Sequence, residues 1–271
     1  MKTVIVGTGR MGFVQARLGR VFGDRLSGAA DFDAGARAAF EAAFGIACAP
    51  SVDGVDVGDA DLVWLTVSDG QIGDAAAALR GRLKPSCVVF HTSGALPASM
   101  ICEKLPENAC ASLHPLIACP LQSASDDAVV AAYRGVVHTV EGDADAVSLG
   151  RALVSRLDAA CVEIRQGTKP LYHAGAVFAS NYPLVLMDAA VRLLMTCGFS
   201  YEQALDASRR MCRQCLDALD QAPARAALTG PVKRGDMATI QRHEAALAAY
   251  PDLLELYRAL KDGAMRLCGR L

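Results

Sequence analysis

A short apolar run that breaks into glycines constrains this chain more than any other feature of its sequence. Residues 3–6 are β-branched and almost wholly apolar, and they lead directly into Gly7-Thr8-Gly9-Arg10-Met11-Gly12. Such a run is typical of a buried parallel strand. In G-x-G-x-x-G the first glycine permits a tight turn, the second lets a pyrophosphate approach the backbone, and the third lets the next helix pack closely. The motif therefore predicts a dinucleotide-binding unit with the phosphates at a helix N-terminus.

An acidic residue is expected roughly 20 residues after such a turn, where it binds the ribose hydroxyls. Asp31 fits this position, in the sequence Ala30-Asp31-Phe32-Asp33. Its carboxylate would repel the 2′-phosphate of NADP and bind the free ribose diol of NAD. The sequence therefore favours NAD, while Arg10 or Arg37 keeps NADP open because a guanidinium can bind that phosphate.

Composition excludes several classes of protein. The chain has 271 residues, 52% of them hydrophobic, which is enough for two modest domains with real cores. Its net charge is −2 and no basic block is present, so nucleic acid is not an expected partner. The N-terminal apolar stretch is too short for a signal peptide, and Asn181, Asp188 and Arg192 interrupt the most apolar long segment. These features predict a soluble cytoplasmic protein without a membrane partner.

The ten cysteines are scattered without a disulfide framework. In a chain with no export signal, most of them are expected to be small buried hydrophobic residues. Cys212 and Cys215 form the one close pair, but a structural zinc needs four ligands. Cys110, His114 and Cys119 match no zinc spacing, so no metal is predicted. A redox protein acting through Cys212 or Cys215 remains an alternative.

Apolar runs alternate with helical patterns over the first 165 residues, as in the βαβ units of a doubly wound sheet. The later strands are predicted at residues 61–67, 87–91, 109–113, 135–140 and 160–164, and helices at 75–82 and 145–157. Only helical patterns follow, at residues 169–197, 201–219, 237–248 and 251–267. The prediction is an α/β Rossmann domain, residues 1–166, with a parallel sheet, and an all-helical domain, residues 167–271. Thr168 is expected to cap the long helix and Pro183 to kink it.

Ligands bind outside the carboxyl ends of the strands in open α/β sheets. The polar residues that follow the predicted strands are therefore expected beside the cofactor. The predicted cofactor-binding residues are Gly7, Thr8, Gly9, Arg10, Met11, Gly12, Asp31, Ser68, Asp69 and Thr92.

The predicted long helix carries Lys169 and His173 four residues apart on one face, with Asn181 two turns further on. Polar groups on a buried face need partners, so purely structural roles are one interpretation. A proton-handling pair, with Asn181 orienting a substrate, is the other. A second polar cluster follows in residues 228–236. Asp236 and its glycines are explained by a turn and a helix cap, but Arg234 and His243 are not.

Six segments together resemble the Rossmann-like proteins with a C-terminal domain of unknown function, the 2520 family. These segments are GTGRMG at 7–12, HTSGAL at 91–96, SLHPL at 112–116, KPLYHA at 169–174, FASNY at 178–182 and ALTGPVKRGD at 227–236. The resemblance covers nearly the whole chain. It implies kinship with ketopantoate reductase, pyrroline-5-carboxylate reductase, and the 6-phosphogluconate and β-hydroxyacid dehydrogenases.

In the hydroxyacid and ketopantoate enzymes, a catalytic lysine opens the long helix and an asparagine four residues later orients the substrate. Lys169 matches that lysine, whereas His173 stands where the asparagine would be. The resemblance therefore implies an oxidoreductase that moves a hydride between a nicotinamide and a small carbonyl or imine carbon. Lys169 would donate the proton, His173 would position or share it, and His114 or Ser93 would contact the nicotinamide amide or the substrate.

The rest of the substrate is expected to contact the second polar set. That set is Asn181, Thr229, Arg234, Asp236 and His243. A non-catalytic protein that binds the cofactor as a sensor or structural ligand is the alternative, because the glycine motif would serve both. A homodimer through the helical domain is expected, because so apolar a long helix would expose a large patch on a monomer.

Overall fold

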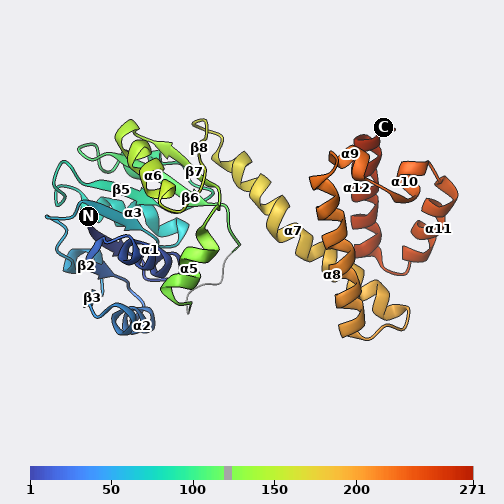
Figure 1. Cartoon of the computed structure of the whole chain (residues 1–271), viewed down its shortest axis with the longest axis horizontal. Helices are drawn as coiled ribbons and strands as arrows, with labels where there is room; N and C mark the ends of the chain where they lie inside the picture. Colours follow the sequence, from blue (N-terminus) through green and yellow to red (C-terminus); the bar gives the residue numbers. More distant parts are fainter. Residues whose placement is uncertain (119–123, 271) are drawn as a thin grey trace. The chain divides into compact units, whose positions relative to one another are not determined.

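The computed structural model describes residues 1–118 and 124–270, and its first unit is built on one sheet (Figure 1). Its strands are β1 (Lys2–Val6), β2 (Arg25–Ala30), β3 (Cys48–Ala49), β4 (Leu62–Leu65), β5 (Val88–His91), β6 (Cys110–Pro115), β7 (His138–Gly142) and β8 (Cys161–Glu163). The strand order is β3-β2-β1-β4-β5-β6-β7-β8. The chain reverses its direction of travel across the sheet between β1 and β4, which is where ligands bind in doubly wound folds.

The sheet departs from the predicted parallel arrangement at one pairing. All neighbouring strands from β3 to β6 are parallel, but β7 runs antiparallel to β6, with Leu113 opposite Val140. β8 then pairs in parallel with β7. The predicted Rossmann sheet with a helical C-terminal part is therefore confirmed, with its last two strands reversed.

Alternate side chains of each central strand pack into two cores, one on each face of the sheet. Val4, Val6 and Val63 face one side of the sheet, while Ile5 and Trp64 face the other. This period of two shows that the continuously apolar runs are buried on both faces, as in parallel sheets. On the second face, Trp64 stacks on Phe90 with ring centroids 5.0 Å apart.

Helices cover both faces of this sheet (Figure 1). They are α1 (Arg10–Val21), α2 (Ala34–Phe44), α3 (Ile72–Leu79), α4 (Ser99–Cys102), α5 (Asp126–Tyr133) and α6 (Ala144–Ser155). Residues of α3 and α4 pack in the first core, and residues of α1, α2 and α6 pack in the second. The carboxyl ends of β1, β4 and β5 lead into short loops that carry polar side chains.

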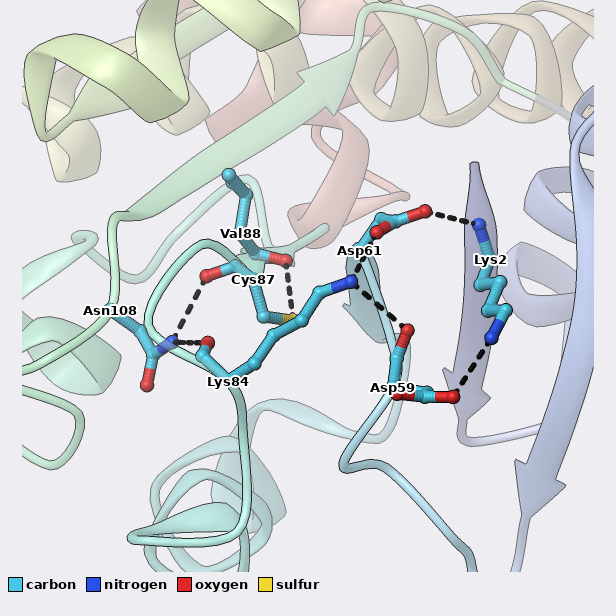
Figure 2. A network of polar contacts seen from close by, with 7 residues as sticks. All are labelled: Lys2, Asp59, Asp61, Lys84, Cys87, Val88 and Asn108. Atoms are coloured by element: carbon cyan, nitrogen blue, oxygen red, sulfur yellow. Dashed lines mark hydrogen bonds and ion pairs between the residues drawn. The ribbon is translucent and has the colours of Figure 1, made fainter.

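A network of polar contacts ties the opposite, amino ends of the central strands together (Figure 2). The Asp61 carboxylate accepts hydrogen bonds from the backbone N–H of Lys2, at 2.7 Å, and from Nζ of Lys84, at 2.5 Å. The Lys84 ammonium holds the pKa of Asp61 below its usual value. Asn108 donates to the carbonyl groups of Lys84 and Cys87. These contacts join β1, β4 and the turn before β5 at one edge of the sheet.

The chain forms two compact units, Met1–Phe178 and Ala179–Leu271. The division falls inside α7 (Lys169–Thr196), whose first part belongs with the sheet. The boundary predicted from sequence near residue 166 stays a prediction. Pro183 lies inside α7, and the predicted kink there stays a prediction. The Thr168 hydroxyl donates to the Arg165 carbonyl, and the predicted cap of α7 by Thr168 stays a prediction.

The second unit is entirely helical in its described residues. After the second part of α7 it contains α8 (Tyr201–Asp217), α9 (Ala224–Ala227), α10 (Gly230–Arg234), α11 (Met237–Leu247) and α12 (Pro251–Cys268). Ser200 and Gln203 form a reciprocal capping box at the start of α8. An ion pair of 2.9 Å between Arg192 and Asp252 links α7 to α12.

By length and composition alone, α7 is also apolar enough to cross a membrane; it is the one such helix in the described chain. A helix of a soluble protein can pass the same test, so this observation is weak support for a membrane protein. Lys169, the first residue of α7, donates hydrogen bonds to Ser93 and Ser112 of the unit Met1–Phe178.

Candidate functional site

The glycine turn after β1 has the geometry of a phosphate cradle. Gly7 has a φ of 96°, and a Cβ added at Gly12 would lie 2.1 Å from the Gly7 carbonyl oxygen. Contacts within the chain therefore require both glycines. A Cβ at Gly9 would meet nothing within 4 Å, so no contact within the chain explains why this residue is glycine.

Gly9 is also the N-cap residue of α1, and it has no side chain to accept from the first N–H groups of that helix. Those groups and the helix dipole favour an anion. The open space at Gly9 is therefore where a pyrophosphate fits. Thr66 braces the turn from β4, since its hydroxyl donates to the Gly7 carbonyl at 2.5 Å. Sequence reasoning missed Thr66.

Asp31 lies beside this turn, as predicted. One carboxylate oxygen accepts from the backbone N–H of Thr8 at 2.6 Å and from its hydroxyl at 3.1 Å. The other accepts from the backbone N–H of Asp33 at 2.9 Å. Arg37 donates to the backbone carbonyls of Asp31 and Phe32, so its guanidinium holds this loop. Arg10 is exposed at the start of α1.

A cavity of about 290 Å³ adjoins Asp31. Its wall includes Phe32 and three apolar side chains, Val52, Val67 and Ala78. Polar residues, among them Asp53 and Asp74, line the rest of the cavity. A partly apolar cavity next to a carboxylate suits an adenosine, with the base among the apolar groups and the ribose at the acid.

The next two strand ends carry further predicted cofactor-binding residues. The Ser68 hydroxyl donates to the Gln71 side chain at 2.7 Å, and Asp69 begins the short turn of helix that follows. Thr92 follows β5, and its backbone N–H donates to the Leu65 carbonyl. These residues lie along the same edge of the sheet as the glycine turn.

Lys169 is buried at the end of β5 and β6, with only 1% of its surface exposed. Its ammonium donates to the Ser93 carbonyl at 2.8 Å and to the Ser112 hydroxyl at 2.6 Å. Burial lowers the pKa of Lys169 to about 8, although the charges of Glu141 and Asp69 oppose this effect. The structure therefore brings together two of the predicted catalytic residues, Lys169 and Ser93, in one hydrogen-bonded group.

Two histidines beside Lys169 are held neutral. Burial and the charge of Lys169 lower the pKa of His91 to about 3 and that of His114 to about 4. His91 accepts from the backbone N–H of Ser93 at 3.2 Å, so it has a structural role in the turn. His114 Nδ1 lies 2.6 Å from the Tyr172 hydroxyl.

His114 and His173 meet above Gly94. A Cβ built on Gly94 would lie 2.9 Å from His114 Nε2 and 2.9 Å from His173 Nδ1. Both nitrogens therefore approach the same point of the backbone. The buried Nδ1 atom of His173 has no hydrogen-bond partner among the described residues.

Sequence reasoning missed two residues of this cluster, Ser112 and Tyr172. Ser112 lies two residues before His114 on β6, so both side chains point to the same side of the sheet. Tyr172 lies one helical turn after Lys169. Both residues were within the quoted motifs, and these spacings were the signal that could have identified them.

The second predicted polar set belongs to the second unit, and the structure shows a local role for most of its members. Asp236 accepts from the backbone N–H of Thr239 and caps α11, as predicted. His243 contacts the Tyr257 hydroxyl at 3.0 Å. Asn181 accepts from Ser180, Thr229 is the N-cap of α10, and Arg234 ends that helix. Their predicted contacts with a substrate stay predictions.

Nine cysteines lie in the described residues and none forms a disulfide there. Cys119 lies outside those residues. Cys212 and Cys215 lie on α8, with Cys215 exposed. Cys102, Cys110 and Asp143 place potential ligand atoms within 4.8 Å of one another, a group that the sequence did not predict. In the same group, Asp143 already accepts from the backbone N–H of Cys110.

The glycine cradle, the carboxylate after β2 and the strand order define a Rossmann-type dinucleotide-binding fold. Residues 136–263 match the family model of a domain of unknown function, DUF2520. The resemblance predicted from the sequence is thereby confirmed: a Rossmann-type fold occurs together with a match to this domain over residues 136–263. No curated protein sequence matches the chain.

Solved structures share this fold at low sequence identity. A candidate NADP oxidoreductase from Bacteroides fragilis superposes with a TM-score of 0.79 and 17% identity, over 98% of each chain. A Thermotoga maritima protein gives a TM-score of 0.75 and 21% identity, also over 98% of each chain. Plasmodium falciparum pyrroline carboxylate reductase with NADP bound gives 0.62 and 10%, over 99% of this chain and 98% of that one. At such identities the likeness concerns the fold alone.

Proposed function

We propose that this protein is an oxidoreductase that transfers a hydride between a nicotinamide dinucleotide and a small carbonyl or imine compound. One observation carries the proposal: the cradle at Gly7–Gly12 follows β1, and the cluster around Lys169 lies at the carboxyl ends of β5 and β6 in the same sheet. A protein that only sensed the cofactor would need the cradle but not a buried lysine among neutral histidines. The similar structures named for NADP agree with a nicotinamide cofactor.

The residues present fit such a cofactor. The open N-terminus of α1 would hold the pyrophosphate, and Asp31 would accept hydrogen bonds from the ribose diol. We propose NAD because the carboxylate of Asp31 repels a 2′-phosphate, and because Arg37 is bonded to backbone carbonyls. When bound, the reduced cofactor supplies the hydride.

Lys169 handles the charge and the proton in this mechanism. Hydride addition to a carbonyl or imine carbon pushes an electron pair onto the oxygen or nitrogen. A lysine with a pKa of about 8 is charged at neutral pH, and it stabilises this negative charge and then gives up a proton. Two of its N–H groups are fixed by Ser93 and Ser112, which leaves one to donate.

Cofactor binding is expected to raise the melting temperature. A ligand that binds only the folded state at 100 times its Kd stabilises that state by about 2.7 kcal/mol. We expect NAD or NADH to give the larger shift and NADP or NADPH the smaller one, measured by differential scanning fluorimetry. No shift with any of the four would contradict the proposed function.

Gly9→Ala is the matched control for this measurement. The backbone of Gly9 is extended, with a φ of −71°, and a Cβ there meets nothing within 4 Å, so the variant should melt like the wild type without ligand. The same Cβ would occupy the space of the pyrophosphate. The nucleotide-induced shift should therefore disappear in this variant.

We also propose a soluble homodimer that forms through the C-terminal helical unit, because α7 carries a long apolar sequence. Multi-angle light scattering without detergent should give twice the 28.4 kDa chain mass at micromolar concentration. A monomer would refute the dimer, and recovery of the protein only with membranes would refute its solubility.

A further inference from the structure

The cluster above Gly94 contains a buried ring nitrogen that has no hydrogen-bond partner in the described residues. His173 Nδ1 is buried without a partner in the part of the chain that the structure describes, and His114 Nε2 approaches the same point over Gly94. A buried polar atom without a partner costs free energy. A ligand with a polar atom at this point would contact both imidazoles.

The direction of the contact between His114 and Tyr172 decides what that polar atom must be. The two rings are nearly perpendicular, at 84°, with Nδ1 and the hydroxyl oxygen 2.6 Å apart. A phenol is a better hydrogen-bond donor than a neutral imidazole, and an unprotonated ring nitrogen is the better acceptor. Tyr172 therefore donates and His114 Nδ1 accepts.

The other ring nitrogen must then carry the proton. His114 is neutral at physiological pH because it is buried beside the charged Lys169. In a neutral imidazole whose Nδ1 accepts, Nε2 carries the hydrogen. The nitrogen that approaches Gly94 is thus a donor.

We propose that Tyr172 fixes His114 as an Nε2–H donor to a carbonyl oxygen, so that the protein reduces an aldehyde or ketone, or oxidises the matching alcohol, in preference to an imine. This inference rests on the proposed function. Tyr172 acts as a positioning residue, and His114 contacts the substrate.

Hydrogen-bond matching favours the carbonyl over a protonated imine. A carbonyl oxygen accepts from His114 and from Lys169 together, and both bonds strengthen as charge develops on that oxygen. The hydride adds to the carbonyl carbon, the π pair moves to oxygen, and the oxygen takes a proton from Lys169 while His114 keeps its own. A protonated imine instead presents an N–H group, which would face the His114 N–H without an acceptor between them.

The tautomer is measured directly by long-range ¹H–¹⁵N NMR on the full-length protein at pH 7. Among the five histidines, the spectrum of His114→Gln assigns the His114 signals. We expect a protonated Nε2 and an unprotonated Nδ1 in the wild type, and a loss of this single tautomer in Tyr172→Phe. A protonated Nδ1 in the wild type, as a tautomer or as imidazolium, would overturn the proposal.

Kinetics test the substrate class. Glyoxylate and pyruvate serve as carbonyl probes and 1-pyrroline as the imine probe, each with NADH and NADPH. We expect turnover of a carbonyl probe, with kcat about 10-fold lower in Tyr172→Phe and nucleotide affinity unchanged. His114→Gln, whose amide can keep a donor near the Nε2 position, should retain more activity than His114→Ala. Turnover of 1-pyrroline alone would overturn the assignment of a carbonyl substrate.

These two readouts separate the inference from the function on which it rests. Failure of every nucleotide to bind removes the proposed function, whatever the NMR spectrum shows. Nucleotide binding with the wrong His114 tautomer removes only this inference.

Discussion

Lys169→Met is expected to lower kcat by about 10²–10⁴-fold, the usual contribution of a general acid. The Kd for the nucleotide should change little, because Lys169 bonds to Ser93 and Ser112 and not to the glycine turn. Stopped-flow or steady-state assays give kcat, and fluorescence titration with NADH gives the Kd. Lys104→Met, which removes an exposed lysine of the same unit, is the matched control.

The same variant should keep or gain stability. A shift of the Lys169 pKa from 10.5 to about 8 corresponds to about 3 kcal/mol of cost for burying the charge. Methionine fills similar space without that cost, although it loses the two hydrogen bonds. Unfolding in urea should therefore show an unchanged or raised free energy. A large loss of stability with unaltered turnover would assign Lys169 a purely structural role.

The pH dependence follows from the same shift. Between pH 8 and 10.5 the folded protein has released the Lys169 proton while the unfolded chain still holds it. Because the unfolded state binds more protons, the contribution of Lys169 to stability rises with pH in this window. Turnover in the reductive direction should fall through pH 8, and Lys169→Met should lose both dependences.

Asp31→Asn is expected to weaken NADH binding and to reduce the discrimination against NADPH. Hydrogen bonds to a charged group contribute about 1.5–3 kcal/mol, which corresponds to a 10- to 150-fold loss of affinity for NADH. Asparagine can still accept from Thr8, so the glycine turn should persist. The ratio of the two dissociation constants, measured by calorimetry, tests the role of the carboxylate.

Asp127→Asn provides the control for net charge, because it removes an exposed carboxylate on α5. It should leave both dissociation constants within about twofold, since exposed charges are screened by salt. Tighter binding of NADPH than of NADH by the wild type would contradict the choice of NAD.

Local spacing was enough to predict the glycine turn and the position of Asp31 beside it. The strand, the three glycines and Asp31 follow one another at characteristic spacings in the sequence, so they could be recognised without the structure. The two-residue strand β3 has too few residues for any periodicity and was not predicted. The direction of β7 was also missed, because its pattern is the same whether it runs parallel or antiparallel to β6.

The cluster around Lys169 was predictable only in part. The helical spacing of Lys169 and His173 placed them on one face, but Ser112 lies 57 residues away along the chain. Only the fold joins the end of β6 to the start of α7. His173 Nδ1 has no partner among the described residues, and His114 contacts Tyr172; both facts depend on side-chain packing, which a single sequence does not reveal.

The network at the amino ends of β1 and β4 has a practical consequence for anyone who wishes to re-engineer this protein (Figure 2). It lies at the edge of the sheet opposite the glycine turn, so it can be strengthened without disturbing the groups proposed for chemistry. Most substitutions that create a new specificity reduce stability. Stabilising substitutions around Asp61 and Lys84 would offset the stability lost when residues at the carboxyl ends of the strands are changed.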